Sequence, residues 1–199
     1  MAIKDNAAIV DKMEASVEKR ANGVSGVGIG SVWDWECYNK EGKLKWKESV
    51  HNTVMQKGLV TTLDCLFHGQ TPPATWYVGL FESNTAMTAG TATYAAPGYT
   101  ECTAYDEGTR GEFVESAAST AGTSSLSNSA SKASFTMNDT KTIYGGFLVG
   151  GTCGTFCATK NDTAATGGIL YCASKFTVSK DVVNDDVVKL TVTVQAVSG

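Results

Sequence analysis

Histidine is the side chain most often used for acid-base chemistry near neutral pH, and this chain of 199 residues has only two, His51 and His68. They flank a segment with helical periodicity. Neither lies near a Gly-x-Ser-x-Gly sequence, which marks the nucleophile of many serine hydrolases. A Ser-His-Asp triad is therefore disfavoured, and we interpret both histidines as helix-boundary or packing residues.

The cysteines and carboxylates offer little more chemistry. Cys153 and Cys157 are the only close pair among six cysteines, and no second pair of ligands lies at a spacing that suits tetrahedral zinc. We interpret them as two thiols in a loop, with a disulfide in an oxidising medium as the alternative. Asp185 and Asp186 precede the last predicted strand and are interpreted as solvating a turn. The carboxylates of a glycosidase meet only in space, so that alternative stays open.

No catalytic residue, cofactor or metal site is therefore predicted, and the chain is not expected to be an enzyme. With 42% hydrophobic and 18% charged residues it can bury a core. A net charge of −4 disfavours nucleic acid as a partner. No apolar run approaches the roughly 18 residues that span a bilayer, and the first residues do not resemble a signal peptide. We expect synthesis in a cytoplasm, with no membrane partner.

Residues 1–22 are predicted to form a helical arm. Ile9, Met13 and Val17 lie near one helical face of this segment, with most of its charges elsewhere. Residues 23–30 have glycine at four of eight positions and are predicted to be a hinge or an extended connector. Residues 31–199 then form the body.

The body begins with a predicted hairpin. Its second strand places Lys43, Lys45 and Lys47 on one face, opposite Leu44 and Trp46. We interpret the lysines as a solvated edge that resists aggregation, with binding to an anionic surface as the alternative. Together with the apolar residues of the arm, they are the predicted partner-binding residues.

An amphipathic helix is predicted over residues 53–68. Thr53 and Gln56 match a capping box, and Gly69 is suited to a left-handed C-terminus. The predicted apolar face is expected to lie across a sheet and consists of Met55, Leu59, Leu63 and Leu66 or Phe67.

The rest of the chain is predicted to consist of strands and long loops. The segment 75–81 is apolar on both faces, and alternation over residues 188–196 indicates a strand with one buried face. The acidic segment 101–115 is interpreted as a solvated loop, with the lysine face of another copy as an alternative partner. The fold class predicted is mainly β: an antiparallel β-sandwich with one internal amphipathic helix and an N-terminal helical arm.

Several short motifs are similar to a family of small virion structural proteins from tailed bacteriophages and their prophages. They are His51-Asn-Thr-Val54, Gly58-Leu59, Leu63-Asp64, Phe67-His-Gly69, Trp76-Tyr-Val-Gly-Leu80, Gly98-Tyr-Thr-Glu101, Ala133-Ser-Phe135, Gly145-Gly-Phe147 and the strand 187–195. The likeness covers roughly residues 30–197. It implies a structural role in the phage head or tail.

We expect a capsid decoration or cement protein, located in the virion and assembled in the bacterial cytoplasm. Its expected partners are the major capsid protein, other virion proteins and further copies of itself. A tail or fibre component is one alternative. A receptor- or glycan-binding module is another, with Tyr94, Tyr99 and Tyr105 as stacking faces for sugar, although core or loop-anchoring roles for these tyrosines are preferred.

Overall fold

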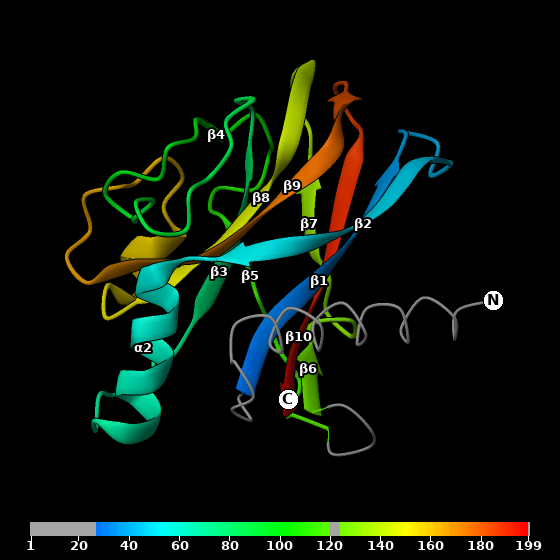
Figure 1. Cartoon of the computed structure of the whole chain (residues 1–199). Coiled ribbons are helices and arrows are strands. Elements are labelled where there is room, and N and C mark those ends of the chain that lie inside the picture. The colour runs from blue at the N-terminus through cyan, green and yellow to red at the C-terminus, as the bar shows by residue number, and fades with distance from the viewer. Residues whose placement is uncertain (1–26, 120–123, 199) are drawn as a thin grey trace.

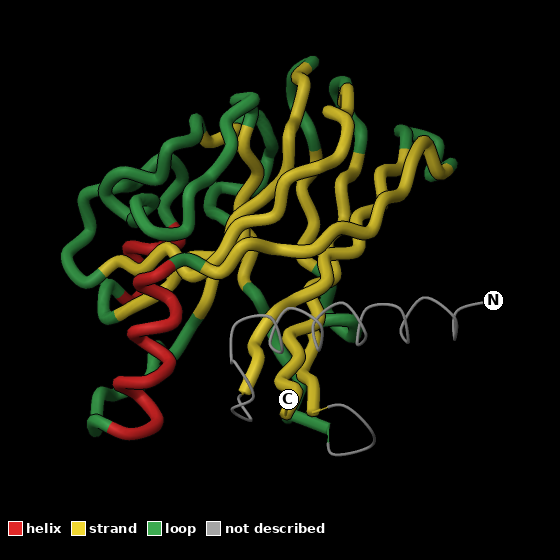
Figure 2. Tube along the Cα trace, viewed as in Figure 1, coloured by secondary structure: helices red, strands yellow, loops and turns green. Residues whose placement is uncertain are grey.

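The computed structural model describes residues 27–119 and 124–198, and within these ranges the chain is mainly β (Figures 1 and 2). The predicted arm, including Ile9, Met13 and Val17, lies outside the described residues. The elements in chain order are β1 (Val27–Tyr38), β2 (Leu44–Val54), α2 (Gln56–Phe67), β3 (Trp76–Phe81), β4 (Glu101–Cys102), β5 (Gly111–Glu112), β6 (Ser124–Ser127), β7 (Ala133–Thr136), β8 (Lys141–Gly151), the 3-10 helix η1 (Gly154–Ala158), β9 (Gly168–Val182) and β10 (Val187–Ser198).

The described strands form one open sheet of ten strands, in which every pairing is antiparallel. The strand order is β4-β3-β8-β9-β2-β1-β10-β6, with β5 on β3 and β7 on β10. Strand β2 joins the two halves. Its residues up to His51 pair with β1, and residues 52–54 pair with β9. The predicted mainly β class is confirmed at this level.

The predicted hinge is wrong at its C-terminal end. Residues 27–30 belong to β1 and pair in register with β10, from Val27 opposite Ser198 to Gly30 opposite Gln195. The glycines resemble a flexible connector in the sequence, but β10 supplies the hydrogen-bond partners that order them as strand. The body therefore extends to Val27, and residues 23–26 lie outside the described residues.

The main core gathers side chains from both halves of the sheet. Trp33 and Trp35 of β1 are buried as their alternation predicts. The ring of Trp35 meets Phe176 of β9 edge-on, with centroids 5.1 Å apart. A Cβ on Gly146 of β8 would stand 2.6 Å from the Trp35 ring, so glycine leaves the space that this indole occupies. Large aromatic side chains therefore bring β1, β8 and β9 into one packed cluster.

Helix α2 begins three residues later than predicted, because Thr53 and Val54 complete β2 against β9. The predicted capping box does not form. Met55 occupies the N-cap position without a side-chain cap bond. The predicted C-terminus is confirmed: Gly69 has a φ of +72°, and the N–H groups of His68 and Gln70 both donate to the carbonyl of Asp64.

No helix among the described residues is long and apolar enough to cross a membrane.

Candidate interaction surface on helix α2

The side of α2 that faces the body is made of small residues. Gly58 and Thr61 are its buried residues, and Thr62 is half-buried. A Cβ on Gly58 would stand 2.5 Å from the carbonyl oxygen of Tyr171 in β9. The hydroxyl oxygens of Thr62 and Tyr171 lie 3.2 Å apart, within hydrogen-bond distance. The helix can therefore approach β9 closely only because its inward residues carry little volume.

Buried polarity on this side is satisfied locally. Thr61 donates its hydroxyl to the carbonyl oxygen of Lys57 at 2.8 Å. Such a bond to the preceding turn lets a threonine pack inward without an unpaired hydroxyl.

The opposite side of α2 exposes five large apolar side chains, which we call the apolar face of α2. They are Leu59 (38% exposed), Val60 (37%), Leu63 (58%), Leu66 (66%) and Phe67 (82%). Their spacing places them on one side of the helix, which projects from the end of β2 away from the sheet (Figure 1). A contiguous patch of this kind on a soluble domain usually marks an interaction site.

This finding corrects the expectation that the apolar face packs across the sheet. Met55 is buried, but it precedes the helix, and the leucines and Phe67 point outward. Hydrophobic periodicity finds the apolar face without showing what covers it. The stripe of Gly58, Thr61, Thr62 and Cys65, spaced i, i+3, i+4 and i+7, is the sequence signal for a second, close-packing face.

The three predicted partner-binding lysines differ in their surroundings. Lys43 precedes β2, whereas Lys45 and Lys47 lie within it, and all three are exposed. Lys45 forms an ion pair with Asp186, whose side chain is only 1% exposed. Within the described residues, neither Lys43 nor Lys47 forms an ion pair. Lys45 is therefore a structural counterion as well as a surface charge.

The carboxylate pair before β10 does not simply solvate a turn. Asp186 is buried, and besides Lys45 it accepts the N–H of Val183 at 2.9 Å. Asp185 accepts from the Lys40 ammonium at 2.7 Å, and this hydrogen bond lowers the pKa of Asp185. The two carboxylates hold the β9–β10 turn to the hairpin of β1 and β2.

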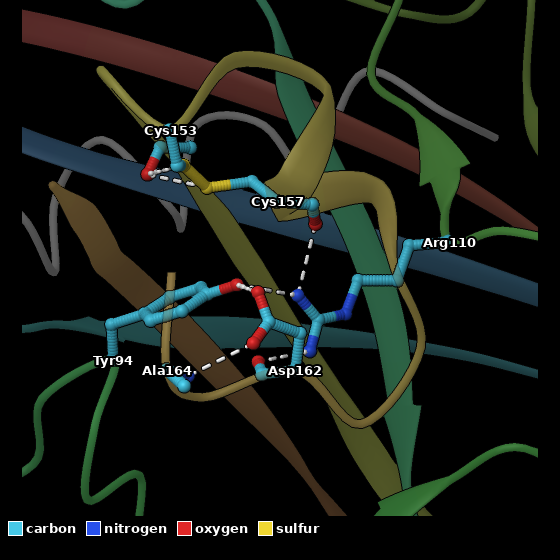
Figure 3. The surroundings of a disulfide bond; sticks show 7 residues. Tyr94, Arg110, Cys153, Cys157, Asp162 and Ala164 are labelled. Atoms are coloured by element: carbon cyan, nitrogen blue, oxygen red, sulfur yellow. Dashed lines mark hydrogen bonds between the residues drawn. A yellow bond between two sulfur atoms is a disulfide. The ribbon is translucent and has the colours of Figure 1, made fainter. Parts of the chain in front are cut away.

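A buried ion pair organises the loops at the other end of the sheet. Arg110 binds both carboxylate oxygens of Glu101, at 2.9 and 2.6 Å. It also donates to the carbonyl oxygens of Cys157 and Asp162, at 2.9 and 3.0 Å (Figure 3). The solvated-loop interpretation of residues 101–115 is therefore wrong for these two charges. They were not predicted, because a salt bridge formed by tertiary contacts leaves no periodic signal.

Cys153 and Cys157 form the disulfide that was the alternative interpretation, and not the two free thiols that were preferred. Cys153 and Cys157 are joined across η1, with their Cα atoms 5.8 Å apart (Figure 3). The carbonyl of Cys157 is the one that accepts from Arg110, so the disulfide loop and the ion pair stabilise one another. Burial raises the pKa of the Cys37 and Cys172 thiols to about 12, which keeps them unreactive.

The tyrosines considered for sugar stacking are enclosed. Tyr94 and Tyr105 are buried, and Tyr99 stacks between Phe81 and Phe147 with centroid distances of 5.4 and 4.7 Å. Their preferred interpretation as core and loop anchors agrees with these positions.

The two histidines are not brought together with a nucleophile. His51 is exposed opposite Val32 in the β1–β2 ladder, and His68 is exposed at the C-terminus of α2. In residues 27–119 and 124–198, no group of three or more His, Cys, Asp or Glu side chains is placed to hold a metal ion.

No model of a known protein family matches the chain, and a search of the curated proteins finds no match. The function must therefore be inferred from the residues themselves, and the apolar face of α2 is the feature that most needs a functional explanation.

Proposed function

We propose that this chain is a non-enzymatic structural component of a tailed-phage virion, of the capsid decoration or cement type. The observation that carries the proposal is the apolar face of α2. Five large exposed apolar side chains lower the solubility of a monomer. Such a face therefore favours a protein that works while bound to neighbours. The segment of residues 51–80 that resembles phage virion proteins also contains this helix.

The proposed architecture is a β-sandwich in which the two halves of the sheet form two packed layers. The contact between Trp35 and Phe176 and the space that Gly146 leaves for the indole support it. Residues 1–22 are the proposed helical arm of this sandwich.

The proposed mechanism is mass action. A protein that binds the assembled shell and not its separate subunits stabilises the shell by its binding free energy, without any chemical step. The proposed partners are the major capsid protein or other virion proteins, and the location is the virion. The apolar face of α2 supplies a hydrophobic contact to a neighbouring molecule on the shell, and Lys43 and Lys47, near the opposite end of β2, supply exposed cations.

The test is the position of the chain in a purified particle, determined by cryo-electron microscopy. We expect density for the sheet and α2 on the outer surface of the shell, with α2 against a neighbouring molecule. Density in the tail alone would exclude a decoration role and favour a tail component.

A binding assay makes the same test at residue level. Purified protein is added to particles that lack it, and Leu63→Asp is compared with Val178→Asp, a matched change at a 65% exposed position of β9. We expect Leu63→Asp to abolish binding and Val178→Asp to retain it. Equal binding by both variants would remove the apolar face from the proposal.

A further inference from the structure

The proposed function does not name the segment that covers the apolar face of α2. We propose that the occupant is the N-terminal arm, residues 1–22, of a second copy of this chain, so that neighbouring copies are joined by exchange of their arms. This inference names the partner of the surface on which the proposed function rests.

The chemistry of the arm matches the face. Ile9, Met13 and Val17 recur at i, i+4 and i+8, and the predicted helix over residues 5–20 would be about 24 Å long, against about 18 Å for α2. Leu59, Leu63 and Leu66 recur at i, i+4 and i+7 on the face itself. Two helices with apolar ridges of this spacing can pack against each other along their length.

Charge does not oppose the contact. The arm has four acidic and four basic residues through position 22. On α2, Lys57 and Asp64 also contribute one charge of each sign. The association is therefore driven by apolar burial, with no net repulsion between the two segments.

The route of the chain favours a second copy over the same chain. The 26 residues before β1 join the body at Val27. The last pair between β1 and β2 is Val32 with His51. The residues of β1 before Val32 pair with β10 alone, whereas the residues of β2 after His51 pair with β9 and lead into α2. Val27, the first described residue, therefore lies on a different branch of the sheet from the one that carries α2 (Figure 1).

The surface area that the contact would bury also favours an exchange of arms between two copies. Taking the patch on α2 as on the order of 500 Å², one arm on one helix buries roughly 1,000 Å² counted on both sides. That is below the roughly 1,600 Å² of a stable interface, whereas two reciprocal contacts reach about 2,000 Å². A pair of arms exchanged between two copies is thus sufficient where a single helix-to-helix contact is not.

The experiment is a cross-link between two differently tagged chains, one carrying Met13→Cys and the other Leu63→Cys. Both have Cys65→Ser, because that native thiol lies on α2. After mixing and mild oxidation, we expect a covalent mixed dimer on a non-reducing gel. Asp11→Cys, on the opposite side of the predicted arm helix, replaces Met13→Cys in the matched control and should reduce the yield about tenfold.

Two results would overturn the inference. One is the absence of a mixed dimer from chains that remain folded by circular dichroism. The other is a chain carrying both Met13→Cys and Leu63→Cys that forms the cross-link only within itself.

A second measurement uses protein that retains all its native cysteines. Leu63→Asp should raise the dimer dissociation constant by about tenfold or more, and Val178→Asp should leave it unchanged. Because both experiments use purified protein, they can fail or succeed independently of where the chain lies in a particle.

Discussion

At the scale of single residues, two ion pairs each contain a buried carboxylate. Arg110 and Glu101 have side chains that are 2% and 4% exposed. Burial alone lowers the pKa of Arg110, but the hydrogen bond and the charge of Glu101 outweigh it, and the net shift is upward. The guanidinium therefore remains charged, and it depends on Glu101 for its counterion.

Glu101→Gln should destabilise the fold, because it leaves a buried guanidinium without its counterion. We expect a loss of about 3 kcal/mol in the free energy of unfolding, measured by denaturant titration. Glu36→Gln, in the more exposed pair with Lys132, is the control and should change stability by about 0.5 kcal/mol or less. Equal effects of the two substitutions would contradict the structural importance of the buried pair.

Lys45→Met tests whether Lys45 is structural. The substitution removes a partner of the buried Asp186 carboxylate, and a loss of about 1–2 kcal/mol is expected after allowance for the partial exposure of Lys45. Lys47→Met, in the same strand, should alter stability by about 0.5 kcal/mol or less. Thermal unfolding of the two variants side by side is the measurement, and a stable Lys45→Met variant would show that Asp186 does not need this partner.

At the scale of elements, α2 reverses the usual arrangement of an amphipathic helix. Its small residues face β9, and its leucines and Phe67 face outward. The close approach is set by Tyr171, whose backbone leaves no room for a side chain at Gly58. The helix is therefore held by shape complementarity to the body, and its apolar side chains remain exposed.

Gly58→Ala separates helix propensity from packing. Alanine favours a helix by about 1 kcal/mol over glycine, yet its Cβ would meet the Tyr171 carbonyl at 2.5 Å. We expect a net loss of stability in denaturant titration. Leu63→Ala is the counterpart on the outer face, and it should leave the stability of the monomer almost unchanged while weakening self-association. A stabilised Gly58→Ala variant would mean that α2 moves freely on β9.

At the scale of the whole molecule, the described residues form a body with a hydrophobic core of its own. Its core lies among the strands, and β1 is paired from Val27 onward. We propose that the arm and the apolar face of α2 are the parts that associate with other molecules.

Deleting residues 1–22 should leave a folded, soluble body with an unchanged melting temperature. The truncated chain should no longer self-associate or join particles, because the segment proposed to cover α2 is missing. Size-exclusion chromatography with light scattering measures the first effect, and incorporation into particles measures the second. Unimpaired incorporation of the truncated chain would refute a docking role for the arm.

Much of the strand content could be predicted from alternation. Trp33, Trp35 and Cys37 are buried as expected, as are Val188 and Leu190 in the last strand. Period-two patterning is a local signal, so it survives without knowledge of the partner strand. The pairing partners, the start of β1 at Val27 and the burial of the Arg110–Glu101 pair depend on residues far along the chain and were not predictable.

The sequence by itself determined that residues near 53–68 contain a helix with one apolar face and a left-handed end at Gly69. Only the tertiary structure decided the direction of that face. A helical repeat defines two sides, but the choice of which side is buried depends on the surface it meets. Here that surface is Tyr171, more than one hundred residues away, and its close contact with Gly58 turns the leucines outward.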